Sequence, residues 1–134
     1  MIAKLFIITF VFVFAIILPY QSVQAINKQE NYQKRTSQKF LDDVESSNES
    51  IIKLKSGMLI EILATGAADA KSPTVSDQCS VTYKGTFKNG EQFDAGTTKF
   101  APNQVIKGWT EAMQLMGEGD KWKLYIPYTL AYGL

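Results

Sequence analysis

The side chains that could carry chemistry in this sequence are aromatic and acidic, because histidine is absent and cysteine occurs once. Without histidine the chain lacks the usual general base, the Ser-His and Cys-His nucleophile pairs and the imidazole metal ligands. It also has no glycine-rich phosphate loop. What remains is Gly108-Trp109, at the start of a short helical pattern, and Asp94, directly after Phe93. An indole in this setting suits the base of an apolar pocket, so we expect chemistry that needs no metal and no cofactor.

Taken one at a time, these residues favour a structural role. Aromatic side chains such as Tyr83, Phe93 and Phe100 dominate protein cores, and a lone aspartate such as Asp94 often caps a turn. Trp122 belongs to a regular strand pattern, and we expect it to be purely structural. Only the joint spacing of the site candidates favours function.

Charge and cysteine content restrict the partners. Lys4 is the only charged residue among the first 25, so beyond residue 25 the chain has 13 acidic and 13 basic residues. A neutral surface argues against nucleic acid or an anionic membrane as a partner. Cys79 is the single cysteine, so no internal disulfide can form, and we expect a buried inert thiol.

Residues 1–25 have the pattern of a signal peptide. Lys4 supplies the positive charge, Leu5–Leu18 is the apolar region, and Val23–Ala25 resembles a cleavage site. The alternative is a membrane anchor, but a spanning helix needs about 20 apolar residues. We therefore expect cleavage after Ala25, a secreted or lumenal protein, and no stable membrane insertion after cleavage.

Residues 26–55 are predicted to form a helical linker. Tyr32, Thr36, Phe40 and Val44 recur every four residues, which gives a solvated helix a thin apolar stripe. The stripe could pair with another copy, although a frayed linker is favoured, so the oligomeric state stays open. Asn48-Glu49-Ser50 is a weak match to the glycosylation pattern, and whether Asn48 is modified also stays open.

The rest of the chain alternates like strands around one helix. Gly57–Leu63 and Cys79–Phe87 are strand patterns, with Cys79, Val81 and Tyr83 on one face. Asn89-Gly90 predicts a two-residue type I′ hairpin turn, followed by a returning strand that ends in a bulge or break at Asp94–Gly96. A helix is expected from about Trp109 to Met116, and a strand at Lys121–Ile126 turns Trp122 inward. The order predicts an α+β fold with one antiparallel sheet and one short helix across it.

Three segments together carry a family resemblance. "VTYKGTFKNGEQFD", "QVIKGWTEAMQLM" and "IPYTLAYG" have the order and spacing seen in FKBP-type peptidyl-prolyl isomerases, in particular the secreted macrophage infectivity potentiator-like subgroup. The resemblance covers about Ser56 to Gly133, so residues 56–134 are taken as the isomerase domain. It implies a twisted antiparallel sheet wrapped on one short helix, and catalysis of rotation about X-Pro bonds in Pro-containing polypeptides.

The resemblance also implies a role for each site residue. Trp109 would form the pocket base and Val105 and Ile106 one side, with the Ile106 N–H holding a substrate carbonyl. The pocket walls would be Tyr83, Phe93 and Phe100. Tyr83, Asp94 and Tyr132 would act at the twisting amide, Asp94 by accepting a hydrogen bond or orienting Tyr83. Gly108 is expected to let the backbone turn so that Trp109 faces the pocket. Immunosuppressant macrolides are further ligands that the family implies.

Two features depart from the family pattern. The loop Ala95–Lys99 is short and has no arginine to pair with Asp94. The sequence given ends at Leu134, where the resemblance implies a further flap and a last strand inside the sheet, so we expect a C-terminally incomplete domain. A non-catalytic, chaperone-like module that holds Pro-containing apolar segments is the alternative, and an inactive truncated product is a third possibility. By this expectation residues 1–134 do not form a stable, active isomerase.

Overall fold

The computed structural model describes the backbone of residues 2–132 and the side chains of residues 22–132. The chain divides into two compact units, Met1–Thr36 and Ser37–Leu134. Helix α1 (Ile2–Ser47) makes up the first unit and continues into the second. Most of the predicted signal peptide, residues 1–21, lies outside the described side chains. Nowhere in the described part is a helix both long enough and apolar enough to cross a membrane.

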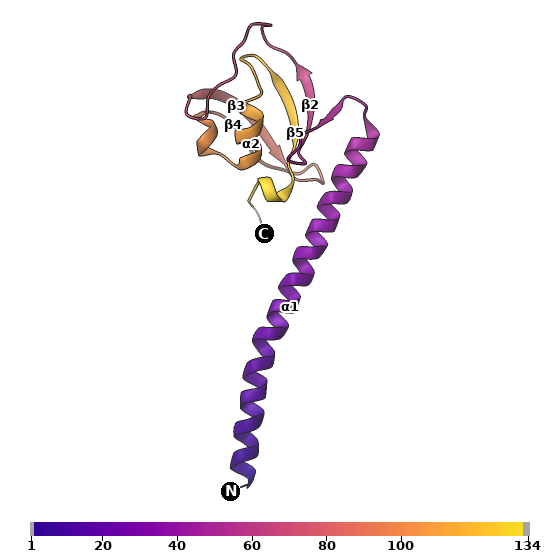
Figure 1. Cartoon of the computed structure of the whole chain (residues 1–134), viewed down its shortest axis with the longest axis vertical. Coiled ribbons are helices and arrows are strands. Elements are labelled where there is room, and N and C mark those ends of the chain that lie inside the picture. Colours follow the sequence, from indigo (N-terminus) through magenta and orange to yellow (C-terminus); the bar gives the residue numbers. More distant parts are fainter. Residues whose placement is uncertain (1, 133–134) are drawn as a thin grey trace. The chain divides into compact units, whose positions relative to one another are not determined.

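The second unit contains five antiparallel strands in two ladders (Figure 1). The first ladder has the order β1-β2-β5, from β1 (Ile51–Lys53), β2 (Leu59–Ala64) and β5 (Lys121–Tyr125). The second is a hairpin of β3 (Cys79–Thr86) and β4 (Gln92–Phe100). The predicted α+β class with antiparallel strands around one short helix is confirmed. The strands, however, form two ladders where one sheet was expected.

Helix α2 (Lys107–Met113) contacts both ladders, through Ala112 on the side of the first and through Trp109 on the second. Ala112 is fully buried in a cluster with Ile60 of β2 and with Met58, the residue directly before β2. The cluster is extended by partly buried apolar side chains, namely Leu54, Trp122, Leu124, Ile126 and Leu130. The inward orientation predicted for Trp122 is thus confirmed. The helix begins two residues earlier and ends three residues earlier than the sequence pattern indicated.

Gly108 permits close contact between α2 and the residue that follows β5. A Cβ on Gly108 would lie 2.7 Å from Cγ2 of Ile126, closer than real Cβ contacts allow. The expected reason for this glycine, a backbone turn, is wrong: Gly108 lies inside α2 and is not among the glycines with positive φ. It is needed because the helix packs directly on Ile126.

The last turns of α1 cover the opposite face of the first ladder. Leu59 alternates with the core-facing Met58 and Ile60 but is also fully buried, and its register partner is Tyr125. The Tyr125 ring lies against Phe40 of α1, with ring centroids 6.4 Å apart. This end of α1 therefore belongs to the folded unit.

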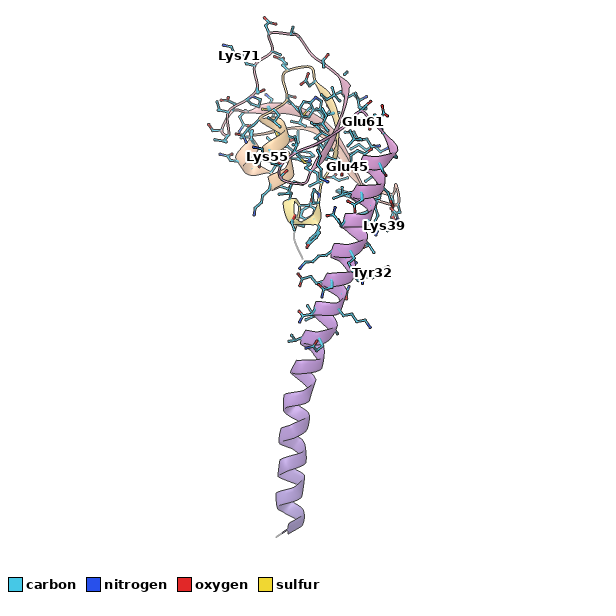
Figure 2. The ribbon with its side chains drawn as sticks, turned by 45° about the vertical axis from the view of Figure 1, so that its right-hand side comes forward. Tyr32, Lys39, Glu45, Lys55, Glu61 and Lys71 are labelled. Carbon is cyan, nitrogen blue, oxygen red and sulfur yellow. The ribbon has the colours of Figure 1, made fainter. Side chains whose placement is uncertain are left out.

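Polar contacts fix the same end of the helix. Lys53 of β1 pairs with Glu45 at 2.7 Å, and the Asn48 amide donates to Glu61 Oε1 at 3.1 Å. Glu45 and Glu61 lie close to where α1 ends (Figure 2). Asn48 also accepts a hydrogen bond from the Ser50 N–H, so the residue after the helix is held on both sides.

Candidate active site

The β3–β4 hairpin presents one face to Trp109 of α2. Cys79, Val81, Tyr83 and Gly85 share this face with their register partners, which are Phe100, Thr98, Gly96 and Asp94. The burial of β3 alternates along its whole length, half-buried on this face and exposed on the other. The period of two predicted for Cys79, Val81 and Tyr83 is confirmed.

Three aromatic rings meet where the hairpin and the helix come together. The Trp109 ring lies edge-on to Tyr83, with centroids 5.2 Å apart, and edge-on to Phe100, with centroids 6.1 Å apart. Tyr83 and Phe100 are 6.5 Å apart. Edge-to-face geometry at these separations is the favourable arrangement of aromatic pairs. The structure therefore brings together the predicted pocket base, Trp109, and the predicted wall, Phe100, around Tyr83.

Tyr83 also reaches the acidic candidate. Its hydroxyl donates a hydrogen bond to Asp94 Oδ2 at 2.8 Å, across the hairpin and two register pairs along. This hydrogen bond, followed by partial burial and the negative charge of Asp94, raises the pKa of the Tyr83 phenol above its ordinary value. Tyr132 contributes a smaller electrostatic effect in the same direction. At neutral pH the site thus contains a neutral phenol oriented by a carboxylate.

Phe93 reaches the same face through an irregularity in the hairpin. Thr86 pairs with Gln92 and Gly85 with Asp94, so Phe93 is the extra residue of a β-bulge. Its ring lies over Gly85 and against Phe87, with ring centroids 4.9 Å apart, and is 50% exposed. Phe93 therefore lies toward the hairpin tip, and no ring contact joins it to Tyr83, Phe100 or Trp109 among the described residues.

Two expectations for this hairpin are wrong. Gly90 alone of the turn residues has positive φ, at 87°, so Asn89-Gly90 is not a type I′ turn. The Gly90 N–H bonds to the Phe87 carbonyl and the Phe87 N–H to the Glu91 carbonyl, which gives a three-residue loop. The returning strand also does not end at Asp94–Gly96, because β4 continues to Phe100, and the expected bulge lies directly before this segment, at Phe93.

The remaining candidates surround this face. Val105 and Ile106 are half-buried between the short 3-10 helix η1 (Pro102–Gln104) and α2. The Ile106 carbonyl accepts from the Thr110 N–H at 3.0 Å, whereas its own N–H has no partner in the described part of the chain. The Thr110 hydroxyl donates to the Pro102 carbonyl at 2.5 Å and fixes η1 on the helix. Tyr132 follows the 3-10 helix η2 (Tyr128–Leu130) and is 83% exposed.

Sequence reasoning missed two residues of this face, Gly85 and Phe87. Their spacing from Tyr83, at every second position, was the available signal, because such residues share one side of a strand. The bulge at Phe93 was expected as a bulge or break one residue later, at Asp94–Gly96. Among residues 22–132, no three acidic or cysteine side chains lie close enough together to hold a metal ion.

Known proteins are similar to this chain in sequence and in structure. A profile described as FKBP-type peptidyl-prolyl cis-trans isomerase matches residues 69–134. The macrophage infectivity potentiator of Trypanosoma cruzi is 42% identical over 112 residues, which cover 80% of this chain and 56% of that protein. The outer membrane protein MIP of Legionella longbeachae is 40% identical over 115 residues, covering 80% and 47%.

A solved structure is similar as well. The peptidyl-prolyl cis-trans isomerase of Pseudomonas syringae pv. tomato has a TM-score of 0.71 and 30% identity, over 78% of this chain and 77% of that one. The chain spans about half the length of the curated relatives described above.

Proposed function

The chain belongs to the FKBP-type peptidyl-prolyl cis-trans isomerase family, and on this premise we propose that it catalyses rotation about X-Pro bonds in polypeptides. The observation that carries the proposal is the Tyr83–Asp94 hydrogen bond beside the Trp109 and Phe100 rings. These residues combine an apolar surface, which suits a proline ring, with an oriented dipole, which suits the amide next to it.

The proposed reaction needs no covalent intermediate. Rotation about the peptide bond faces a barrier of about 18–20 kcal/mol, because the planar amide must lose its resonance. An enzyme lowers this barrier by binding the twisted amide better than either planar form. The carbonyl of a twisted amide carries less negative charge, so apolar rings such as Trp109 and Phe100 favour it over the planar ground state.

Each site residue has a proposed part in this scheme. Trp109 and Phe100 hold the proline ring, and Val105 and Phe93 bound the pocket on either side. The Ile106 N–H, which has no partner within the described residues, donates to a substrate carbonyl. Tyr83, fixed by Asp94, and the exposed Tyr132 present hydroxyl groups to the amide that twists.

The substrate class and the compartment belong to the same proposal. Substrates are Pro-containing polypeptides, and immunosuppressant macrolides are proposed as competing ligands because the family implies them. We propose export, from the signal-peptide pattern of residues 1–25 and from a relative that is named an outer membrane protein. Assistance to the folding of exported proteins would follow from this location.

A second candidate function is favoured by one observation, the exposure of the site. Phe93 is 50% exposed and Tyr132 is 83% exposed, so water has access to both side chains. Water weakens the preference of an apolar site for the twisted amide. A module that holds Pro-containing apolar segments without turning them over is therefore the alternative.

The two tryptophans provide the test of the site. Trp109→Ala should lower the rate of isomerisation of a Pro-containing peptide by about tenfold or more, with a smaller effect on the melting temperature. Trp122→Ala should do the reverse, because loss of a core indole costs about 3–5 kcal/mol of unfolding free energy. A prolyl isomerisation assay and a melting curve on both full-length variants measure this. Equal behaviour of the two variants would show that the pocket is assigned wrongly.

A further inference from the structure

The geometry points to Gly85 as a positioning residue that determines where the Phe93 ring lies on the site face of the hairpin. The inference rests on the proposed function, because Phe93 matters there as a wall of the substrate pocket. Gly85 would touch no substrate itself and would act only through Phe93.

Space, and not backbone conformation, is what requires glycine at position 85. The residue is absent from the glycines with positive φ, so an L-amino acid could adopt its backbone geometry. A Cβ at this position would lie 2.6 Å from Cζ, 2.8 Å from Cε2 and 3.2 Å from Cε1 of Phe93. The far end of the Phe93 ring thus occupies the space in which any other residue would carry its side chain.

The bulge brings Phe93 into this position. Asp94 is the register partner of Gly85, and the extra residue Phe93 directs its ring over the glycine instead of toward the opposite face. Phe87 supports the ring from the hairpin loop, with centroids 4.9 Å apart. Because Phe93 remains 50% exposed, few contacts other than Gly85 and Phe87 fix its orientation.

Because of these contacts, a substitution at Gly85 should change peptide binding more than stability. A half-exposed ring can turn away from a new methyl group into solvent, so Gly85→Ala should displace Phe93 without unfolding the hairpin. Gly96→Ala is the matched control on the opposite strand and the same face. A Cβ at Gly96 would meet Tyr83 atoms only at 3.6 Å or more, an ordinary van der Waals contact.

The experiment uses the 134-residue chain and a Pro-containing peptide, with peptide affinity measured by NMR titration and turnover by an isomerisation assay. Gly85→Ala should weaken peptide binding and raise KM by about five- to tenfold while kcat changes little, since a pocket wall contributes uniform binding. Gly96→Ala should change either quantity less than twofold. In a Phe93→Ala background, Gly85→Ala should have no further effect, because the residue through which it acts is gone.

A structural readout makes the inference independent of turnover. In the unmodified chain, nuclear Overhauser contacts should join the Gly85 α protons to the Phe93 ring protons, and their absence would overturn the inference. So would a Gly85→Ala effect of equal size with and without Phe93, or one reproduced by Gly96→Ala. A chain that binds peptide but shows no turnover would contradict the proposed isomerase activity. The inference about Gly85 would then be tested by the peptide affinities of the variants.

Discussion

The Tyr83–Asp94 hydrogen bond makes the site depend on pH in a defined direction. The phenol donates to the carboxylate at 2.8 Å, so ionisation would place a phenolate against a carboxylate, and the pKa of Tyr83 is raised. Because the pKa of Tyr83 is higher in the folded state than in the unfolded chain, where it is about 10, the hydrogen-bonded phenol stabilises the fold below about pH 10. This contribution is lost as the pH rises through the folded-state pKa. The hydrogen bond should therefore be intact throughout the neutral range.

We expect Asp94→Ala to lower the pKa of Tyr83 toward its ordinary value. NMR of tyrosine-labelled protein, titrated in the alkaline range, measures each phenol separately. Tyr32, which is exposed and far along the sequence on α1, serves as the internal control. If Tyr83 titrates at the same pH with and without Asp94, the hydrogen bond does not hold in solution.

Much of this arrangement was accessible from residue types and spacing. The grouping of Tyr83, Phe100 and Trp109 could be predicted because three spaced segments resemble one family. The bulge was expected at Asp94–Gly96, but its position at Phe93 could not be predicted, because the position of a bulge depends on how the two strands pair. The glycines were recognised, but a close approach such as Gly108 on Ile126 cannot be seen before both elements are placed.

Helix α2 lies between the hairpin and the first ladder, and at Gly108 it packs directly on Ile126, which leaves no space for a side chain. Gly108→Ala would place Cβ 2.7 Å from Ile126, whose side chain packs on the core cluster and cannot easily yield. Overpacking of this kind costs about 1–3 kcal/mol of unfolding free energy. Denaturant unfolding should show this loss, with Lys107→Ala, an exposed neighbour in the same helix, close to unmodified. Unchanged stability in Gly108→Ala would mean that the contact is not formed.

Local sequence patterns were enough to predict some of the strands and turns but not others. The hairpin and its face were predicted from alternation and from Asn89-Gly90, yet the turn type was wrong because Asn89 keeps a negative φ and the loop uses Lys88 as well. Strand β1 was not predicted, since three residues carry too short a pattern. The contact of Phe40 with Tyr125 joins residues 85 positions apart, and neither local sequence indicates the other.

The end of α1 within the Ser37–Leu134 unit should contribute to the stability of that unit. Phe40 is half-buried against Tyr125, and Phe→Ala at a fully buried core position costs about 3–5 kcal/mol of unfolding free energy, so Phe40→Ala should cost about 1–3 kcal/mol. Tyr32→Ala is the matched control, because this aromatic side chain of the same helix is 65% exposed. Melting curves of the two variants decide the matter. Equal melting temperatures would mean that the helix end does not pack on the sheet in solution.

Strand edges without a ladder partner are a further feature of the folded unit, within the described residues. Within the described residues β3 pairs only with β4 and β5 only with β2, so each has one edge without a ladder partner. Unpaired edges favour association between chains. Activity should therefore be measured at several concentrations of the 134-residue chain, so that association is not mistaken for loss of function.

The central claim is that the site turns X-Pro bonds over and does not merely hold them. The most direct measurement is NMR exchange between the cis and trans forms of a Pro-containing peptide, with its binding affinity measured in the same samples. We expect the full-length form to accelerate exchange, and Asp94→Val to reduce this acceleration by about tenfold or more while affinity changes less. A chain that binds the peptide but leaves its cis-trans exchange rate unaltered would contradict the claim and support the binding module instead.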